Sequence, residues 1–250
     1  MQRLRVIYQR FTSCCGCQLT LLNCEAELAE VVERVDFVEF VMASSTHDDG
    51  GVVDLALIEG SISDPQALEK LLAVRRRSRF LAAVGACALS GGVNRLAGSR
   101  PREALSRVYG AAAENMTYFP PQPVGNFVEV DLRIAGCPPE KKELVWTLGA
   151  LARHGLPALP AYAVCMECRM QENRCLLIED AMPCLGPVTR AGCGARCPSF
   201  GVICEGCRGE VDECNREEEF RLLREIGLPE KEIRARLSRF GSAGHEDDSR

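Results

Sequence analysis

The sequence has few of the features that mark several large classes of protein. It contains three histidines and one tryptophan among 250 residues, and its formal net charge is −5. Binding to nucleic-acid phosphates requires a basic surface, so this charge argues against nucleic acid as the main partner. The histidines, His47, His154 and His245, are too scattered to form a metal site of their own.

Long apolar segments and targeting signals are also missing. No apolar run reaches the length of about 18 residues that a membrane-spanning helix needs. Residues 1–8 alternate charged and apolar side chains, without the apolar core or the small-residue cleavage site of a secretory signal. We therefore expect a cytoplasmic protein with no membrane span.

Cysteine, in contrast, is abundant, with 15 residues. In a reducing cytosol thiols persist and bind metal, and the odd count fits a disulfide framework poorly. A [4Fe–4S] cube needs four thiolates, one for each iron. Eight cysteines separate by spacing into two such sets, namely Cys165, Cys168, Cys175 and Cys184, then Cys193, Cys197, Cys204 and Cys207. Two buried clusters side by side would indicate electron transfer.

Zinc is the alternative metal for these two sets. Cys-x-x-Cys pairs occur at both ends of the block, Cys165–Cys168 and Cys204–Cys207, and such pairs also hold tetrahedral Zn²⁺. A zinc-stabilised scaffold or interaction protein is therefore an alternative hypothesis. The cysteines in the first part of the chain shift the balance toward iron–sulfur clusters.

Residues 1–160 have the pattern of an α/β domain. Apolar runs predict strands, and amphipathic patterns between them predict helices. The expected strands are Leu4–Tyr8, Phe37–Met42, Val52–Ile58, Phe80–Val84 and Phe127–Val130, and the expected helices are Gln18–Val32, Pro65–Arg75 and Lys141–Arg153. Strands that alternate with helices predict a doubly wound parallel sheet with helices on both faces.

The rest of the chain has a different character. Residues 161–214 are rich in cysteine, glycine and proline and have little periodicity, so we expect bound metal to organise an irregular segment. Residues 215–250 begin with a charged helical pattern, which the turn at residues 227–229 should break into a helical hairpin, followed by a polar tail.

A third set of cysteines is expected at one edge of the predicted sheet. Cys14 and Cys17 follow the first strand, Cys87 follows Phe80–Val84, and Cys137 follows Phe127–Val130. The loops after parallel strands all emerge at the carboxyl edge, where ligands bind in doubly wound sheets. We therefore expect these four thiols to converge there.

Four more residues near these sets are assigned as follows. Cys15 competes with Cys14 or Cys17 as a ligand, and we favour the Cys-x-x-Cys pair. Cys24 lies on the first predicted helix, where we expect it to pack in the protein core. Cys214 is expected to bind no cluster. Glu59 follows a strand on the same edge, where it would handle protons or contact a ligand residue, or else cap a helix or face solvent.

The motifs resemble the small subunit of nickel–iron hydrogenases, in particular the delta subunit of soluble bidirectional sulfhydrogenases, and the related 20 kDa-type subunit of complex I. They extend to about residue 240. The resemblance rests on Thr12–Leu19 (TSCCGCQL), Glu59–Ser61 (EGS), Gly85–Ala88 (GACA), Gly136–Pro139 (GCPP) and Cys184–Gly201.

This resemblance implies a flavodoxin-like domain and three [4Fe–4S] clusters. It implies that the proximal set is Cys14, Cys17, Cys87 and Cys137, the medial set is Cys193, Cys197, Cys204 and Cys207, and the distal set is Cys165, Cys168, Cys175 and Cys184. Nickel would lie on a large partner subunit, and electrons would pass to diaphorase-type flavin and iron–sulfur subunits that use NADP, NAD or ferredoxin. A complex-I-like or heterodisulfide-reductase-linked complex is the alternative.

Four differences within the wider family affect these expectations. Better-known members have histidine in place of Cys165 and proline in place of Cys197, so here all twelve ligands would be thiolates. Complex I binds its cluster through adjacent cysteines, which Cys14 and Cys15 could imitate. The eight-cysteine block is missing from the complex I subunit, and this favours the hydrogenase branch.

Overall fold

The protein contains a five-stranded parallel sheet in the order β2-β1-β3-β4-β5. The structure is a computed structural model that describes residues 3–45, 48–97, 101–152 and 155–240. The strands are β1 (Leu4–Arg10), β2 (Val35–Phe40), β3 (Val53–Glu59), β4 (Ser78–Val84) and β5 (Leu132–Ile134). This strand order is that of flavodoxin-like folds, and it confirms the predicted fold class.

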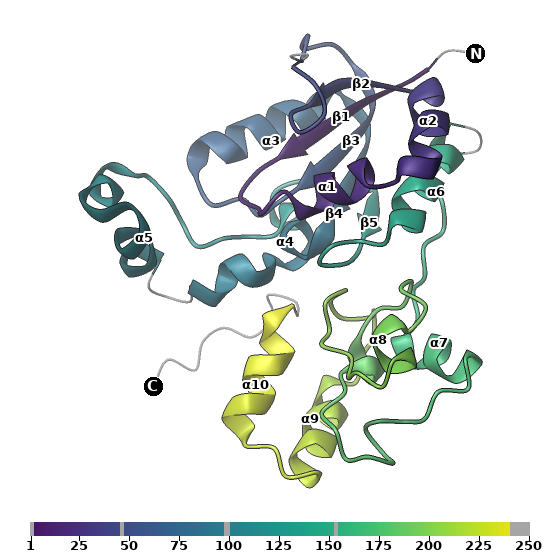
Figure 1. Cartoon of the computed structure of the whole chain (residues 1–250). Helices are drawn as coiled ribbons and strands as arrows, with labels where there is room; N and C mark the ends of the chain where they lie inside the picture. Colours follow the sequence, from purple (N-terminus) through teal and green to yellow (C-terminus); the bar gives the residue numbers. More distant parts are fainter. Residues whose placement is uncertain (1–2, 46–47, 98–100, 153–154, 241–250) are drawn as a thin grey trace.

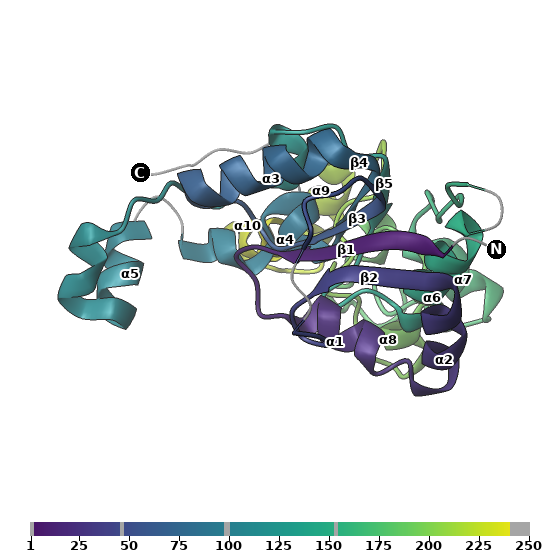
Figure 2. The same cartoon turned by 90° about the horizontal axis from the view of Figure 1, so that it is seen from above.

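Helices cover both faces of the sheet (Figure 2). One face carries α1 (Gly16–Leu22), α2 (Glu25–Arg34) and α6 (Lys141–Leu151), and the other carries α3 (Pro65–Arg77) and α4 (Gly85–Ser90). Successive strand residues point to opposite faces, so Tyr8 packs with the first group and Ile7 with the second. Both faces are therefore apolar, as parallel sheets require.

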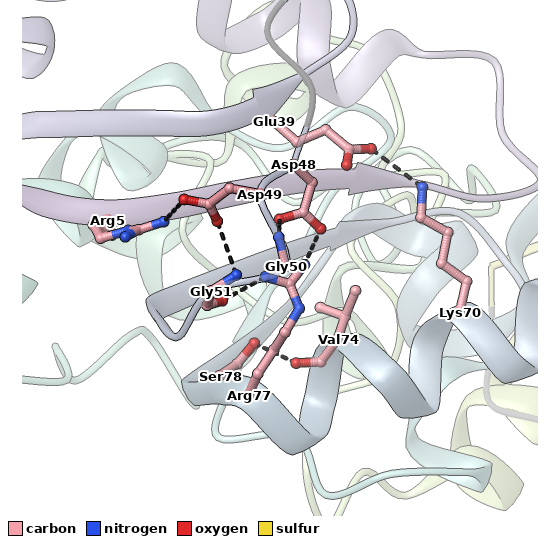
Figure 3. Close-up of polar contacts among 10 residues, drawn as sticks. All are labelled: Arg5, Glu39, Asp48, Asp49, Gly50, Gly51, Lys70, Val74, Arg77 and Ser78. Atoms are coloured by element: carbon pink, nitrogen blue, oxygen red, sulfur yellow. Dashed lines mark hydrogen bonds and ion pairs between the residues drawn. The ribbon is translucent and has the colours of Figure 1, made fainter.

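The amino edge of the sheet is closed by polar contacts (Figure 3). The Arg77 guanidinium pairs with Asp48 and donates to the Gly51 carbonyl oxygen at 2.6 Å. Arg5 pairs with Asp49 at 2.7 Å. These contacts fasten the loop before β3 at the end of the sheet that lies opposite the cysteine loops.

Two predicted elements were wrong in detail. Residues 127–130 are not a strand, because β5 begins later at Leu132. Phe127, Val128 and Val130 are apolar because they pack against the core as a coil that leads into β5. The predicted helix Gln18–Val32 is two helices, since the chain turns at Asn23, whose carbonyl oxygen accepts from Lys141 Nζ at 2.6 Å.

A helical arm extends from the α/β part after α4 (Figure 1). It follows the 3₁₀ helix η1 (Gly92–Ala97) and comprises α5 (Pro101–Tyr109) and η2 (Gly110–Asn115), which pack mainly against each other. A further short 3₁₀ helix, η3 (Val124–Asn126), precedes β5. The sequence analysis did not predict this arm, because its residues alternate short apolar and polar stretches around glycine and proline.

The cysteine-rich part of the chain and the hairpin share one core. The short helices α7 (Val164–Met170), η4 (Gly186–Val188) and α8 (Arg196–Ser199) pack with α9 (Arg216–Glu225) and α10 (Glu230–Arg239). The break at residues 227–229 is confirmed. Residues 161–214 therefore share an apolar core with the hairpin, which contributes Leu223, Ile233 and Leu237. Their organisation by bound metal stays a prediction. None of the helices in the described part of the chain is long and apolar enough to span a membrane.

Candidate metal centres

The proximal set lies at the carboxyl edge of the sheet. Cys14 and Cys17 follow β1 at the start of α1, Cys87 lies in the first turn of α4, and Cys137 follows β5. Burial raises the pKa of Cys87 to about 11, and the thiols of Cys137 and Cys14 add to this rise. Burial also raises the pKa of Cys17, with further contributions from Glu59 and the other three thiols. The structure thus brings these four thiols together.

The backbone comes unusually close to the proximal thiols at Gly85. This residue has a φ of 82°, and a Cβ atom there would lie only 2.4 Å from the Cys17 sulfur. Glycine is therefore required between β4 and α4, both for its backbone conformation and for the space. The Ala86 N–H donates to the Gly136 carbonyl oxygen at 2.9 Å, which ties the Cys87 loop to the Cys137 loop.

Glu59 forms hydrogen bonds with the backbone at the start of α1. Its side chain is only 1% exposed, and its carboxylate accepts from the backbone N–H of Cys17 at 3.4 Å and of Gln18 at 3.1 Å. Burial raises the pKa of Glu59, and the two backbone N–H groups oppose this rise. Glu59 is therefore buried and caps a helix, so it positions Cys17, while proton handling stays a prediction.

Three cysteines lie apart from the sets. Cys15 has a φ of 66°, and its sulfur accepts from Arg10 at 2.7 Å, away from the other thiols. Cys24 is 1% exposed in the core under α1 and α2. Cys214 is partly buried and packs against the core that the cysteine-rich part shares with the hairpin. These positions agree with the sequence analysis, in which none of the three was the favoured ligand.

The distal set surrounds the start of α7 and η4. Burial raises the pKa of Cys165 to about 12, followed by contributions from the thiols of Cys184, Cys168 and Cys175. A Cβ atom on Gly186 would lie 3.1 Å from the Cys165 sulfur and 3.6 Å from that of Cys184. The structure therefore brings the four thiols together where a glycine leaves space for them.

The medial set lies in the loops around α8. Burial raises the pKa of Cys207, which also accepts from a backbone N–H, and the thiols of Cys193 and Cys197 raise it further. Burial raises the pKa of Cys204 to about 12, and Cys207 adds to this rise. Backbone N–H groups of Ala195 and Arg196 reach the Cys193 sulfur, as is usual for sulfur that binds iron.

Two backbone N–H groups connect the three sets in a row. The N–H of Cys137, in the proximal set, lies close enough to the thiol of Cys207, in the medial set, to oppose the rise in its pKa that burial causes. The N–H of Cys204, in the medial set, donates to the sulfur of Cys184, in the distal set, at 3.3 Å. The medial set therefore lies between the other two.

The donor sets suit iron–sulfur cubes. Among the described residues, no group of three or more His, Cys, Asp or Glu side chains is arranged to hold a single metal ion. A cube has a different requirement, because each thiolate binds a separate iron atom around a shared core. In the proximal and distal sets a glycine leaves free the space beside the thiols that a Cβ atom would fill, and backbone N–H groups approach sulfur in the distal and medial sets, so the sets meet this requirement. All three histidines lie outside the described residues.

Sequence reasoning did not find four charged residues close to the medial and distal sets. They are Glu143, Glu167, Arg208 and Glu219. Arg208 could have been noticed because it directly follows Cys207. The others lie in helices whose charged positions look solvent-exposed in the sequence, although Glu219 is 1% exposed in the structure.

Comparison with known proteins assigns the chain to a family. Residues 14–151 match the family described as NADH ubiquinone oxidoreductase, 20 Kd subunit. The chain belongs to this family. The matched part contains all four residues of the proximal set and ends with α6.

Three individual proteins place the chain in the hydrogenase branch. It is 40% identical to the delta subunit of sulfhydrogenase 2 from Pyrococcus furiosus, over 92% of this chain and 95% of that one. It is 33% identical to a subunit of the F420-non-reducing hydrogenase vhu from Methanocaldococcus jannaschii, over 80% of both chains. It also aligns with a solved NAD⁺-reducing [NiFe]-hydrogenase chain at a TM-score of 0.56 and 28% identity, over 64% of this chain and 96% of that one. The chain is thus a hydrogenase-type small subunit.

Proposed function

We propose that the chain is the electron-transfer subunit of a nickel–iron hydrogenase, in which the three thiol sets hold three [4Fe–4S] clusters. The observation that carries the proposal is the row of three sets, in which Cys137 lies next to Cys207 and the Cys204 N–H donates to the Cys184 sulfur. When bound, such clusters supply one-electron transfer at low potential. The chain itself fixes their order and buries one ligand of each set, namely Cys17, Cys204 and Cys184.

The two ends of the row have surfaces suited to partners. At the proximal end Cys14 and Cys137 are exposed, and the apolar side chains of Leu19 and Val93 lie exposed on the neighbouring α1 and η1. We assign this end to a large subunit that holds the nickel–iron site. By this division of labour the chain carries no nickel site of its own.

The distal end suits an electron acceptor or donor. Cys175 is exposed there, and Met166, Met170 and Ile178 are exposed apolar residues around it. Clusters of exposed apolar side chains on a surface mark sites of protein contact. We assign this end to an NAD(P)-linked diaphorase or to ferredoxin. The likeness to a chain of an NAD⁺-reducing hydrogenase supports the nicotinamide alternative.

Metal analysis of anaerobically reconstituted protein tests this proposal. Three cubes require about 12 irons and about 12 acid-labile sulfides for each chain. An iron content near eight per chain would show that only two clusters are present and would contradict the three-cluster proposal. Stoichiometric zinc would favour the zinc-stabilised scaffold instead. The sequence of the large partner subunit would distinguish a complex-I-like assembly, because that subunit would then lack the cysteine pairs that bind nickel.

A further inference from the structure

Arg208 is the most deeply buried arginine side chain that takes part in an ion pair within the described residues. Its side chain is 3% exposed, and its Nη2 atom lies 2.6 Å from Oε1 of Glu143, whose side chain is 8% exposed. The remaining contacts are also internal, because Nε donates to the Ala191 carbonyl oxygen and Nη1 to that of Ala135, both at 2.8 Å. The guanidinium therefore has three buried acceptors.

These contacts connect the two parts of the molecule at their cysteine loops. Ala135 precedes the Gly136–Cys137 loop of the proximal set, and Ala191 precedes the Gly192–Cys193 loop of the medial set. Arg208 itself follows Cys207. A single planar guanidinium thus fixes the positions of two loops that come from different parts of the chain, which a lysine could not do with the same geometry.

The backbone is fitted closely around this ion pair. Gly192 has a φ of 115°, and a Cβ atom there would lie 2.3 Å from Glu143 Oε1 and 2.4 Å from Arg208 Nη2. Among the described residues Glu143 Oε2 has no hydrogen-bond partner. Burying such a pair is costly, and apolar residues of similar size often stabilise a protein as well or better. Stability alone therefore does not explain why a charge lies here.

The positive member of the pair acts on the medial thiols. Arg208 lies within electrostatic reach of both Cys193 and Cys207. The carboxylate of Glu167 is also within electrostatic reach of Cys193. It accepts hydrogen bonds from the backbone N–H groups of Gly192 and Ala195 at 2.9 and 3.2 Å. Glu143 pairs with the guanidinium and so offsets part of its charge.

We propose that Arg208 is a positioning residue that sets the reduction potential of the medial cluster. Reduction adds one negative charge to a cluster, and a fixed positive charge in a poorly solvated place stabilises that added charge. This inference rests on the proposed function, since it requires a cluster bound by the medial set.

Potentiometric titration of the whole chain, followed by electron paramagnetic resonance, tests this inference. Arg208→Gln should shift the medial potential downward, because it removes the charge. Glu143→Gln should shift it upward, because the guanidinium is then left uncompensated. Arg208→Lys keeps a charge and should restore most of the wild-type potential. If the Arg208–Glu143 pair had only a structural role, Arg208→Gln and Glu143→Gln would not shift the medial reduction potential in opposite directions.

Arg196→Gln is a matched control. Arg196 precedes the medial ligand Cys197, but its guanidinium is 65% exposed and pairs with Glu140, so solvent should screen its loss. An unchanged medial potential in Arg208→Gln with full iron content would overturn the inference, as would shifts of the same sign in Arg208→Gln and Glu143→Gln. If Arg208→Gln loses iron, Glu143→Gln alone decides by the sign of its shift. A missing medial signal in the wild type would instead refute the proposed function.

Discussion

At the scale of single residues, the role of Cys15 distinguishes two ways of binding the proximal cluster. One uses the Cys14–Cys17 pair, and the other uses adjacent cysteines, Cys14 and Cys15. Its left-handed backbone turns the thiol toward Arg10, while Cys17 lies among the other proximal thiols. We expect Cys15→Ala to keep the proximal signal and to change the free energy of unfolding by less than about 1 kcal/mol. Cys17→Ala should abolish that signal. Low-temperature electron paramagnetic resonance of the two variants measures this, and the reverse result would indicate ligation by adjacent cysteines.

Glu219 provides a prediction about pH. This carboxyl on α9 is buried beside Cys165 and Cys184, and neither of its oxygens has a hydrogen-bond partner among the described residues. Burial raises its pKa from 4.5 to about 7 in the folded protein. The unfolded chain gives up this proton at lower pH, so stability falls as pH rises from about 4.5 to about 7 and stays low above that range.

We therefore expect Glu219→Gln to be more stable than the wild type at pH 8, by about 3 kcal/mol at about 1.4 kcal/mol for each pKa unit. The gain should shrink toward pH 5. Anaerobic denaturant unfolding at both pH values measures this difference. Glu217→Gln, at an exposed position of the same helix, should show no gain. A gain for Glu219→Gln that is equal at both pH values would contradict the explanation.

At the scale of elements, the eight cysteines after residue 160 should behave as two independent groups. The distal set is built on α7 and η4, and the medial set on the loops around α8. Cys175→Ser and Cys204→Ser should therefore each remove a different signal from the paramagnetic resonance spectrum. Cys24→Ser and Cys214→Ser are controls that should keep all signals. Loss of the same signal in Cys175→Ser and Cys204→Ser would mean that the partition is wrong.

Elements with a strong periodic pattern were predictable from the sequence. The helix that begins at Pro65 has its cap, since Asp64 accepts from the Ala67 N–H at 2.8 Å, and β1, β3 and β4 each contain a run of buried apolar residues. The strand β5 was misplaced because three residues are too few for a pattern, and the neighbouring apolar residues pack as coil. The turn at Asn23 depends on Lys141, which lies 118 residues away, so local sequence could not reveal it.

The meeting of the four proximal cysteines was predictable because parallel strands bring their following loops to one edge. The charged residues around them were not. Glu143 and Arg208 are 65 positions apart, and each looks like a surface residue in its own segment. Their pairing depends on how the two parts of the molecule meet, which neither spacing nor periodicity encodes.

At the scale of the whole molecule, the chain should not react with hydrogen alone. Its proposed role is conduction, and the nickel–iron site would belong to the large subunit. We expect the purified chain to show no hydrogen-dependent reduction of benzyl viologen, and activity to appear when the large subunit is added. Hydrogen oxidation by the chain alone would overturn the proposed division of labour.

The shared core of the cysteine-rich part and the hairpin has a consequence for biosynthesis. Leu223, Ile233 and Leu237 complete that core, and a ribosome adds all three after the last medial ligand, Cys207. The α/β part, in contrast, is complete by the end of α6 at Leu151 and can fold earlier, as domains do during synthesis. Medial and distal cluster insertion would therefore wait until the hairpin has been synthesised, whereas the proximal pocket could be loaded before that point.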